Sequence, residues 1–116
     1  MSQHCFKSQT ATGRAVEVLI GYDRPLNGFF LVVSEAGAAE ETDVDVFIYS
    51  NLSDVELLDL GGLTLDLEHF KRKLNLLGIA LPSPIEAELQ EDRRRRVGNR
   101  FRLYNGVGQL LSDLGV

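Results

Sequence analysis

Arginine is the residue type in this sequence that is best placed to bind a ligand. Six arginines fall within residues 93–102, where no acidic residue stands. Guanidinium groups bind phosphate or carboxylate through two parallel hydrogen bonds, and a neighbouring aromatic ring offers a stacking surface. The segment therefore predicts an anion-binding surface. We expect it to consist of Arg93, Arg94, Arg100, Arg102 and Tyr104.

The other two arginines have acidic partners on the same predicted helix. Glu91 stands four residues before Arg95, and Asp92 stands four residues before Arg96. This spacing brings side chains together on a helix surface and forms weak ion pairs there. The alternative to a binding surface is therefore a solvated helix end, with the arginines of the following strand also paired to acids.

The charge of the chain is unevenly distributed. The net charge is -5, yet residues 1–92 carry -10 and residues 93–102 carry +6. An acidic body repels a phosphate backbone unless the basic segment is well separated from it. The same asymmetry favours self-association, in which the arginines of one copy meet the acids of another. We therefore expect the partner to be a second copy or another protein, with nucleic acid as the alternative that uses the same arginines.

Asp66 and His69 have a spacing that suits acid–base chemistry. On a helix, a carboxylate three residues before an imidazole can orient it. No substrate cleft or further polar partner can be assigned to this pair, so we expect a non-catalytic protein. A small enzyme with a cleft near Asp66, His69 or Asp23 is the second alternative.

The sequence predicts neither a metal nor a cofactor. The chain has two histidines and one cysteine, and the adjacent His4 and Cys5 would lie on opposite faces of a strand. Glycines 106 and 108 lack the third glycine of a dinucleotide motif, because position 111 is leucine. The acidic residues 40–45 lack the spacing of a calcium-binding loop.

A turn provides a second candidate binding site. Residues 23–28 contain a proline followed by Asn27 and Gly28, which is typical of a tight connection between strands. Functional residues often lie on loops held by a rigid scaffold. Tyr22, Asp23 and Arg24 are therefore candidates, with Asp23 and Arg24 bonded to the loop backbone or to each other.

Hydrophobic patterns predict the elements that position these residues. Residues 14–22 and 44–50 alternate between two faces, residues 29–33 are apolar throughout, and residues 4–10 form a weaker strand. Short connections between these four strands predict an antiparallel meander.

Three helices are expected next, at about 54–60, 66–77 and from residue 83 to about 97. Ser53 and Glu56 have the spacing of a capping box, and Ser83 before Pro84 marks the third helix start. Residues 98–99 should end that helix. Residues 100–104 then alternate, which predicts a fifth strand closing onto the sheet.

These patterns predict a single α+β domain over residues 1–116. It would combine an antiparallel sheet of about five strands with two to three helices packed on one face, and residues 105–116 would form a flexible or partner-bound tail. A lone Cys5 excludes an intramolecular disulfide, and no stretch is apolar enough for a signal peptide or a membrane span. We expect a cytoplasmic interaction module, self-associating or acting as an adaptor, with no membrane partner.

Overall fold

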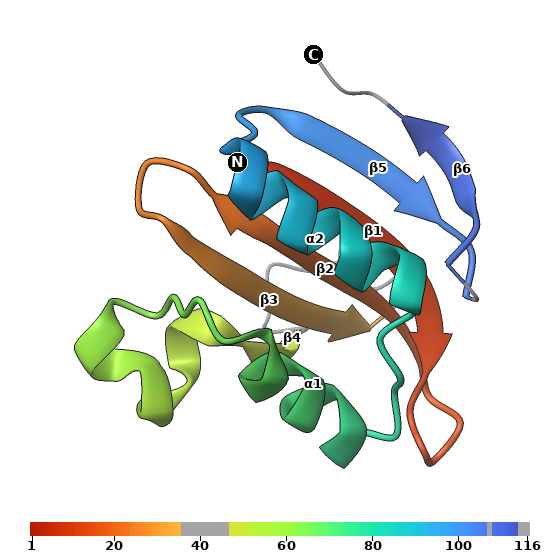
Figure 1. Ribbon diagram of the computed structural model, residues 1–116. Helices are drawn as coiled ribbons and strands as arrows, with labels where there is room; N and C mark the ends of the chain where they lie inside the picture. The colour runs from red at the N-terminus through yellow and green to blue at the C-terminus, as the bar shows by residue number, and fades with distance from the viewer. Residues whose placement is uncertain (36–46, 107, 114–116) are drawn as a thin grey trace.

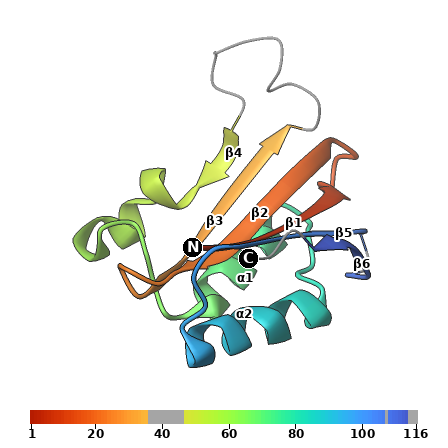
Figure 2. The same cartoon turned by 90° about the horizontal axis from the view of Figure 1, so that it is seen from above.

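The computed structural model describes residues 1–35, 47–106 and 108–113 as a sheet with helices on one side. The strands are β1 (Ser2–Gln9), β2 (Ala15–Asp23), β3 (Gly28–Glu35), β4 (Phe47–Ser50), β5 (Arg100–Tyr104) and β6 (Leu110–Asp113). The helices are α1 (Leu67–Leu76) and α2 (Ser83–Arg95), preceded by the 3-10 helices η1 (Asn51–Ser53) and η2 (Val55–Leu60). Both α-helices lie on the same face of the sheet (Figure 2). The predicted α+β class is confirmed.

The sheet has six strands in the order β4-β3-β2-β1-β5-β6 (Figure 1). Its first four strands form the predicted antiparallel meander. Strand β5, however, pairs with β1 in parallel, because the segment through α1 and α2 crosses the sheet and returns the chain in the direction of β1. The expectation of about five antiparallel strands therefore differs from the structure in strand number and in the pairing of β5.

The end of the chain contributes the sixth strand. Residues 105–116 were expected to form a tail, but Leu110–Asp113 pair with β5 as an antiparallel edge strand. The connection is a tight turn in which the Asn105 side chain accepts a hydrogen bond from the backbone N–H of Gln109, and Gly108 adopts a positive φ of 89°. Residues 107 and 114–116 lie outside the described residues, as does the predicted strand start at residues 44–46.

Helix boundaries follow the predicted pattern, but the capping residues differ. Asp54, not Ser53, caps η2 by accepting a hydrogen bond from the backbone N–H of Glu56, 2.9 Å away. The third helix begins at Ser83 with Pro82 in the capping position and no side-chain cap. It ends where Arg96 adopts the left-handed conformation, with φ 51°, two residues before the glycine expected to end it.

The core lies between the sheet and the two α-helices. The alternating residues of β2 that face the helices, Val16, Val18, Ile20 and Tyr22, are fully buried. They pack with Phe29, Leu31 and Val33 of β3, with Phe70 and Leu74 of α1, and with Ile85 and Leu89 of α2. Each such side chain contributes about 1.5–3 kcal/mol by leaving water. Among the described residues, no helix is both long and apolar enough to cross a membrane.

Candidate functional site

Strand β5 turns its polar side chains toward α2. Arg100 Nη1 lies 2.7 Å from Asp92 Oδ1, and its Nη2 lies 3.2 Å from Glu88 Oε2. Arg102 binds the same Glu88 oxygen at 3.2 Å and Asp113 of β6 at 2.9 Å. The predicted alternation of residues 100–104 is thus present, and its charged face points to the helix, because α2 supplies carboxylates there.

His4 links Asp92 to Tyr104 in the interior of the molecule. Its Nε2 lies 2.6 Å from Asp92 Oδ2 and its Nδ1 lies 2.9 Å from the hydroxyl oxygen of Tyr104. A carboxylate only accepts hydrogen bonds, so Nε2 donates to Asp92, while Nδ1 shares a hydrogen bond with the tyrosine hydroxyl. Arg102 in turn hydrogen-bonds to Tyr104.

Six side chains therefore form a closed circuit, which we call the core polar ring. Its members, in order, are Asp92, His4, Tyr104, Arg102, Glu88 and Arg100. Burial raises the pKa of the Asp92 carboxyl, but hydrogen bonds from His4 and Ser2 and the charge of Arg100 lower the pKa below its ordinary value. The ring keeps a buried carboxylate ionised by surrounding it with donors.

Three residues of the predicted anion-binding surface, Arg100, Arg102 and Tyr104, are instead part of the core polar ring. Arg100 and Arg102 are paired, with 17% and 18% of their side chains exposed. Tyr104 is buried and offers no stacking surface. Of the predicted set, Arg93 and Arg94 are exposed.

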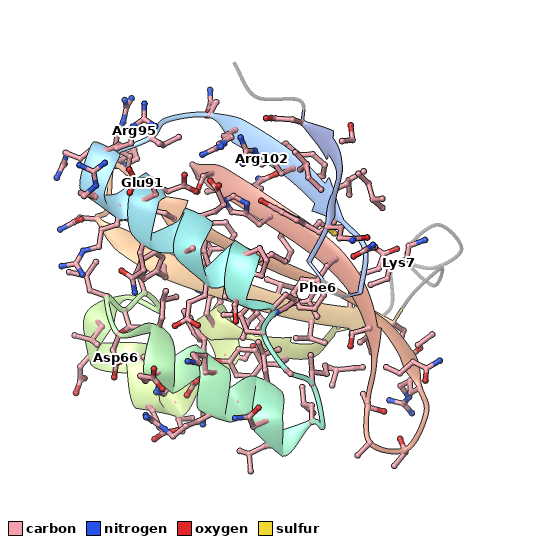
Figure 3. The ribbon with its side chains drawn as sticks, turned by 45° about the vertical axis from the view of Figure 1, so that its right-hand side comes forward. Phe6, Lys7, Asp66, Glu91, Arg95 and Arg102 are labelled. Carbon is pink, nitrogen blue, oxygen red and sulfur yellow. The ribbon has the colours of Figure 1, made fainter. Side chains whose placement is uncertain are left out.

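The predicted ion pairs along α2 are replaced by others. Asp92 is fully buried in the core polar ring and does not pair with Arg96. Glu91 binds the side chain of Arg94, three residues later, instead of Arg95. Glu91 and Arg95 both lie at the C-terminal end of α2, while Arg102 lies on the neighbouring strand (Figure 3).

Arg93 to Arg96, at the C-terminal end of α2, are all exposed. A fifth exposed arginine, Arg24, reaches the same end of α2 from the turn between β2 and β3. The guanidinium Nη1 of Arg24 lies 3.3 Å from the position that a Cβ on Gly98 would occupy. Arg24 therefore packs against the segment that follows α2. We call Arg24 together with Arg93, Arg94, Arg95 and Arg96 the arginine cluster. The glycine at position 98, which leaves room for Arg24, is the one feature of the sequence that is consistent with this contact.

The other two residues of the predicted loop site have structural roles. Tyr22 is fully buried, and its hydroxyl donates a hydrogen bond to Asn27 Oδ1 at 2.6 Å. Asp23 accepts a hydrogen bond from the backbone N–H of Leu26 at 3.2 Å, which is one of the two bonding patterns that the sequence suggested. Only Arg24 of this trio reaches the arginine cluster.

The predicted pair of Asp66 and His69 does not form. Asp66 caps α1 by accepting a hydrogen bond from the backbone N–H of Glu68 at 3.1 Å. His69 Nε2 lies 2.9 Å from Asp54 Oδ2 instead, and the Tyr49 hydroxyl donates to the same oxygen at 2.6 Å. The carboxylate partner of His69 thus comes from the start of η2, not from its own helix.

We call Tyr49, Asp54, Glu56, His69 and Lys73 the Asp54 network. Burial raises the pKa of Asp54, but hydrogen bonds from Tyr49, His69 and the Glu56 backbone, with the charge of Lys73, lower the pKa to about 2. Burial and the bond to Asp54 raise the pKa of the Tyr49 phenol. Lys73 also pairs with Glu56.

The Asp54 network contains a possible set of metal ligands but already holds a cation. Ligand atoms of Asp54, Glu56 and His69 lie within 4.8 Å of one another. The Lys73 ammonium pairs with Glu56 and lies 3.9 Å from Asp54 Oδ2, while that oxygen also accepts two hydrogen bonds. These residues fit a lysine-neutralised network better than a metal centre.

No cavity among those we describe opens onto the Asp54–His69 pair. Three cavities have walls made of described residues, with volumes of about 430, 430 and 230 Å³. His69 lines none of the three. The first is an open depression beside Lys73 and Arg72 on α1, and the other two adjoin the face of the sheet that α1 and α2 leave uncovered. The pair is therefore better explained as a structural contact than as a catalytic one.

Comparison of the chain with protein-family models, with curated protein sequences and with solved structures gave no match.

Proposed function

We propose that this protein is a non-catalytic interaction module that binds an anionic partner through the arginine cluster. The observation that carries the proposal is the position of Arg24 against Gly98, which adds a guanidinium from a distant turn to the four at the end of α2. Within the described residues, Arg94 has an ion-pair partner, Glu91, whereas no salt bridge to Arg24, Arg93, Arg95 or Arg96 lies within 4 Å. Exposed guanidinium groups without local partners can bind carboxylates of another molecule.

An acidic protein segment is the partner that fits this cluster best. Nucleic-acid binding to single strands usually combines basic residues with an aromatic stacking surface, and Tyr104 is buried in the core polar ring. The body of the chain is also acidic, which repels a phosphate backbone. A partner protein, or an acidic surface of a second copy, meets neither objection. We place the module in the cytoplasm, because its lone Cys5 provides no disulfide.

Binding of two labelled probes would test this function. Fluorescence anisotropy with an oligoglutamate peptide should show saturable binding that weakens with added salt. The triple variant Arg24→Ala, Arg93→Ala, Arg96→Ala should weaken binding about tenfold or more, because each lost charge contact contributes roughly 0.5–1 kcal/mol. The control is Arg72→Ala, since Arg72 is an exposed arginine on α1.

Two outcomes would contradict the proposal. The function is wrong if the oligoglutamate peptide does not bind at low salt, or if the triple variant and the Arg72→Ala control bind it equally. Tighter binding of a single-stranded oligonucleotide, with a salt dependence that the triple variant reduces, would support the nucleic-acid alternative instead.

A further inference from the structure

The face of the sheet opposite α1 and α2 carries a row of apolar side chains. Strand register places Leu103, Cys5, Leu19 and Val32 side by side on β5, β1, β2 and β3. Phe101 and Phe30 belong to the next row along the strands, where Gln3 and Gly21 stand between them. Phe30 is 8% exposed, and the others are partly exposed. We call these six residues the open face.

Polar residues border the open face on three sides. The row through Cys5 and Leu19 ends in Ser112 on one edge strand and Ser50 on the other. The row on one side consists of Lys7, Glu17 and Ser34. An apolar centre with a polar rim is the usual composition of an interface between proteins.

Lys7 and Glu17 are the charged residues that indicate the partner. They stand directly opposite each other on β1 and β2, and Lys7 lies on the side of β1 opposite to the buried Phe6 (Figure 3). Among the described residues, neither takes part in an ion pair within 4 Å. Two unpaired charges of opposite sign, in neighbouring positions at the edge of an apolar surface, form a self-complementary pattern.

We propose that the open face binds a second copy of this chain, with a two-fold axis that runs parallel to the strands between β1 and β2. These strands occupy the centre of the six-stranded sheet. Rotation about this axis places β1 of one subunit over β2 of its partner. Lys7 then faces the partner subunit's Glu17, and the same ion pair forms twice.

The apolar residues match under the same rotation. Cys5 faces the partner subunit's Leu19, and Leu103 faces the partner subunit's Val32. The next row brings Phe101 over the partner subunit's Phe30. Two sheets packed face to face lie about 10 Å apart, which lets the opposed side chains interdigitate. A different apolar protein would satisfy the hydrophobic centre, but a second copy also satisfies both charges.

This dimer does not involve the arginine cluster, so its test is independent of the proposed function. Light scattering over a range of concentrations should give a mass approaching twice 12.9 kDa. The mass should persist in high salt, because the interface centre is apolar. Leu19→Glu should shift the protein to monomer, whereas Leu58→Glu, on the exposed surface of η2, should not.

Charge reversal tests the two-fold geometry directly. Lys7→Glu should weaken the dimer at least several-fold, because it places like charges across the axis, and adding Glu17→Lys should restore it. Both positions lie on the surface, so circular dichroism should report unchanged folding. The single Cys5 gives a further measurement: its alkylation by iodoacetamide should slow as wild-type concentration rises, but not in Leu19→Glu.

Three results would overturn the dimer. The first is a monomer at all concentrations. The second is a dimer that Leu19→Glu and Lys7→Glu leave intact. The third is an association that dissociates in high salt and is lost when the arginine cluster is substituted, since that behaviour belongs to contacts between arginines and acids.

Discussion

Two groups of aspartate, histidine and tyrosine occur in this molecule, and they are connected differently. In the core polar ring the three side chains are linked in series: Tyr104 is hydrogen-bonded to His4, and His4 donates to Asp92. In the Asp54 network, Tyr49 and His69 both donate to one oxygen of Asp54. The same three residue types thus form a chain in one place and a convergent pair in the other.

The two groups also differ in the parts of the chain that they join. His4 binds residues 88 and 100 positions away, and it joins β1, α2 and β5 where β5 enters beside β1. Asp54 binds residues 5 and 15 positions away, next to the exposed Glu56. The first group therefore holds the two ends of the fold together in the interior, and the second fixes a local connection beside the exposed Glu56. Loss of a partner should cost more in the interior, where water cannot replace it.

The largest expected difference concerns the two aspartates. Asp92→Ala leaves the fully buried His4 without its carboxylate and leaves Arg100 with Glu88 alone, so the free energy of unfolding should fall by about 3–5 kcal/mol. Urea unfolding followed by circular dichroism measures this loss. If the variant is too unstable to purify, Asp92→Asn keeps the shape and should show a smaller loss. A loss below about 1 kcal/mol in Asp92→Ala would show that the ring does not stabilise the fold.

Acid should reduce the stabilisation that both groups provide, because both carboxyl pKa values are shifted in the same direction. The folded-state pKa of Asp54 and of Asp92 lies below the ordinary carboxyl value. Each carboxylate therefore stabilises the fold above about pH 4 and loses this effect as the pH falls through its folded-state pKa, which is about 2 for Asp54.

Urea unfolding at several pH values between 6 and 2 checks this acid dependence. Asp54→Asn should show a shallower loss of stability than the wild type over the acidic range. Parallel pH profiles for the variant and the wild type would contradict the depressed pKa of Asp54.

A smaller loss is expected from Asp54→Ala. The variant removes the cap of η2 and the acceptor for Tyr49 and His69, and we expect a loss of about 1–2 kcal/mol. Asp54 and His69 are each 7% exposed, whereas Asp92 and His4 are fully buried, so less desolvation is left uncompensated here. Equal losses from Asp54→Ala and Asp92→Ala in the same urea assay would remove the distinction between the two groups.

The smallest effects are expected from the tyrosine hydroxyls. Tyr104→Phe leaves His4 Nδ1 without its hydrogen-bond partner in the interior, which should cost about 1–1.5 kcal/mol. Tyr49→Phe should cost about 0.5 kcal/mol, because Asp54 keeps its other donors. Thermal unfolding of both variants, compared with the wild type, gives the ranking. A larger loss of stability from Tyr49→Phe than from Tyr104→Phe would contradict the expectation that lost hydrogen bonds cost more in the core polar ring.

Local patterns predicted an element correctly where its apolar residues recur at the period of a strand or of a helix. The alternation of residues 14–22 predicted the buried face of β2, and residues 66–77 predicted α1, because a strand or helix with one apolar face has few alternatives. Ser53 and Asp54 are both good capping residues, so the sequence could not distinguish them. In the folded state His69 also donates a hydrogen bond to Asp54, which favours Asp54 as the capping residue.

The strands at the end of the chain could not be placed by local patterns. Residues 110–113 have no strong alternation, and they become β6 because β5 presents an unpaired edge. The direction of β5 depends on the path of α1 and α2 across the sheet. The alternation of residues 100–104 predicted a strand with two different faces, but it did not show which face points to the helices. Glu88 and Asp92 become neighbours of Arg100 only after α2 has packed.

The sequence by itself determined the composition of the candidate surfaces: a basic segment on an acidic chain, alternating strands, and a single cysteine. Tertiary structure decided which charges remain available. It buried Asp92 and paired Arg100 and Arg102, brought Arg24 to the end of α2, and left Cys5 and Leu19 on the open face. The physical reason is that charge and hydrophobicity belong to each residue, whereas ion pairing and burial depend on neighbours that are distant in the chain.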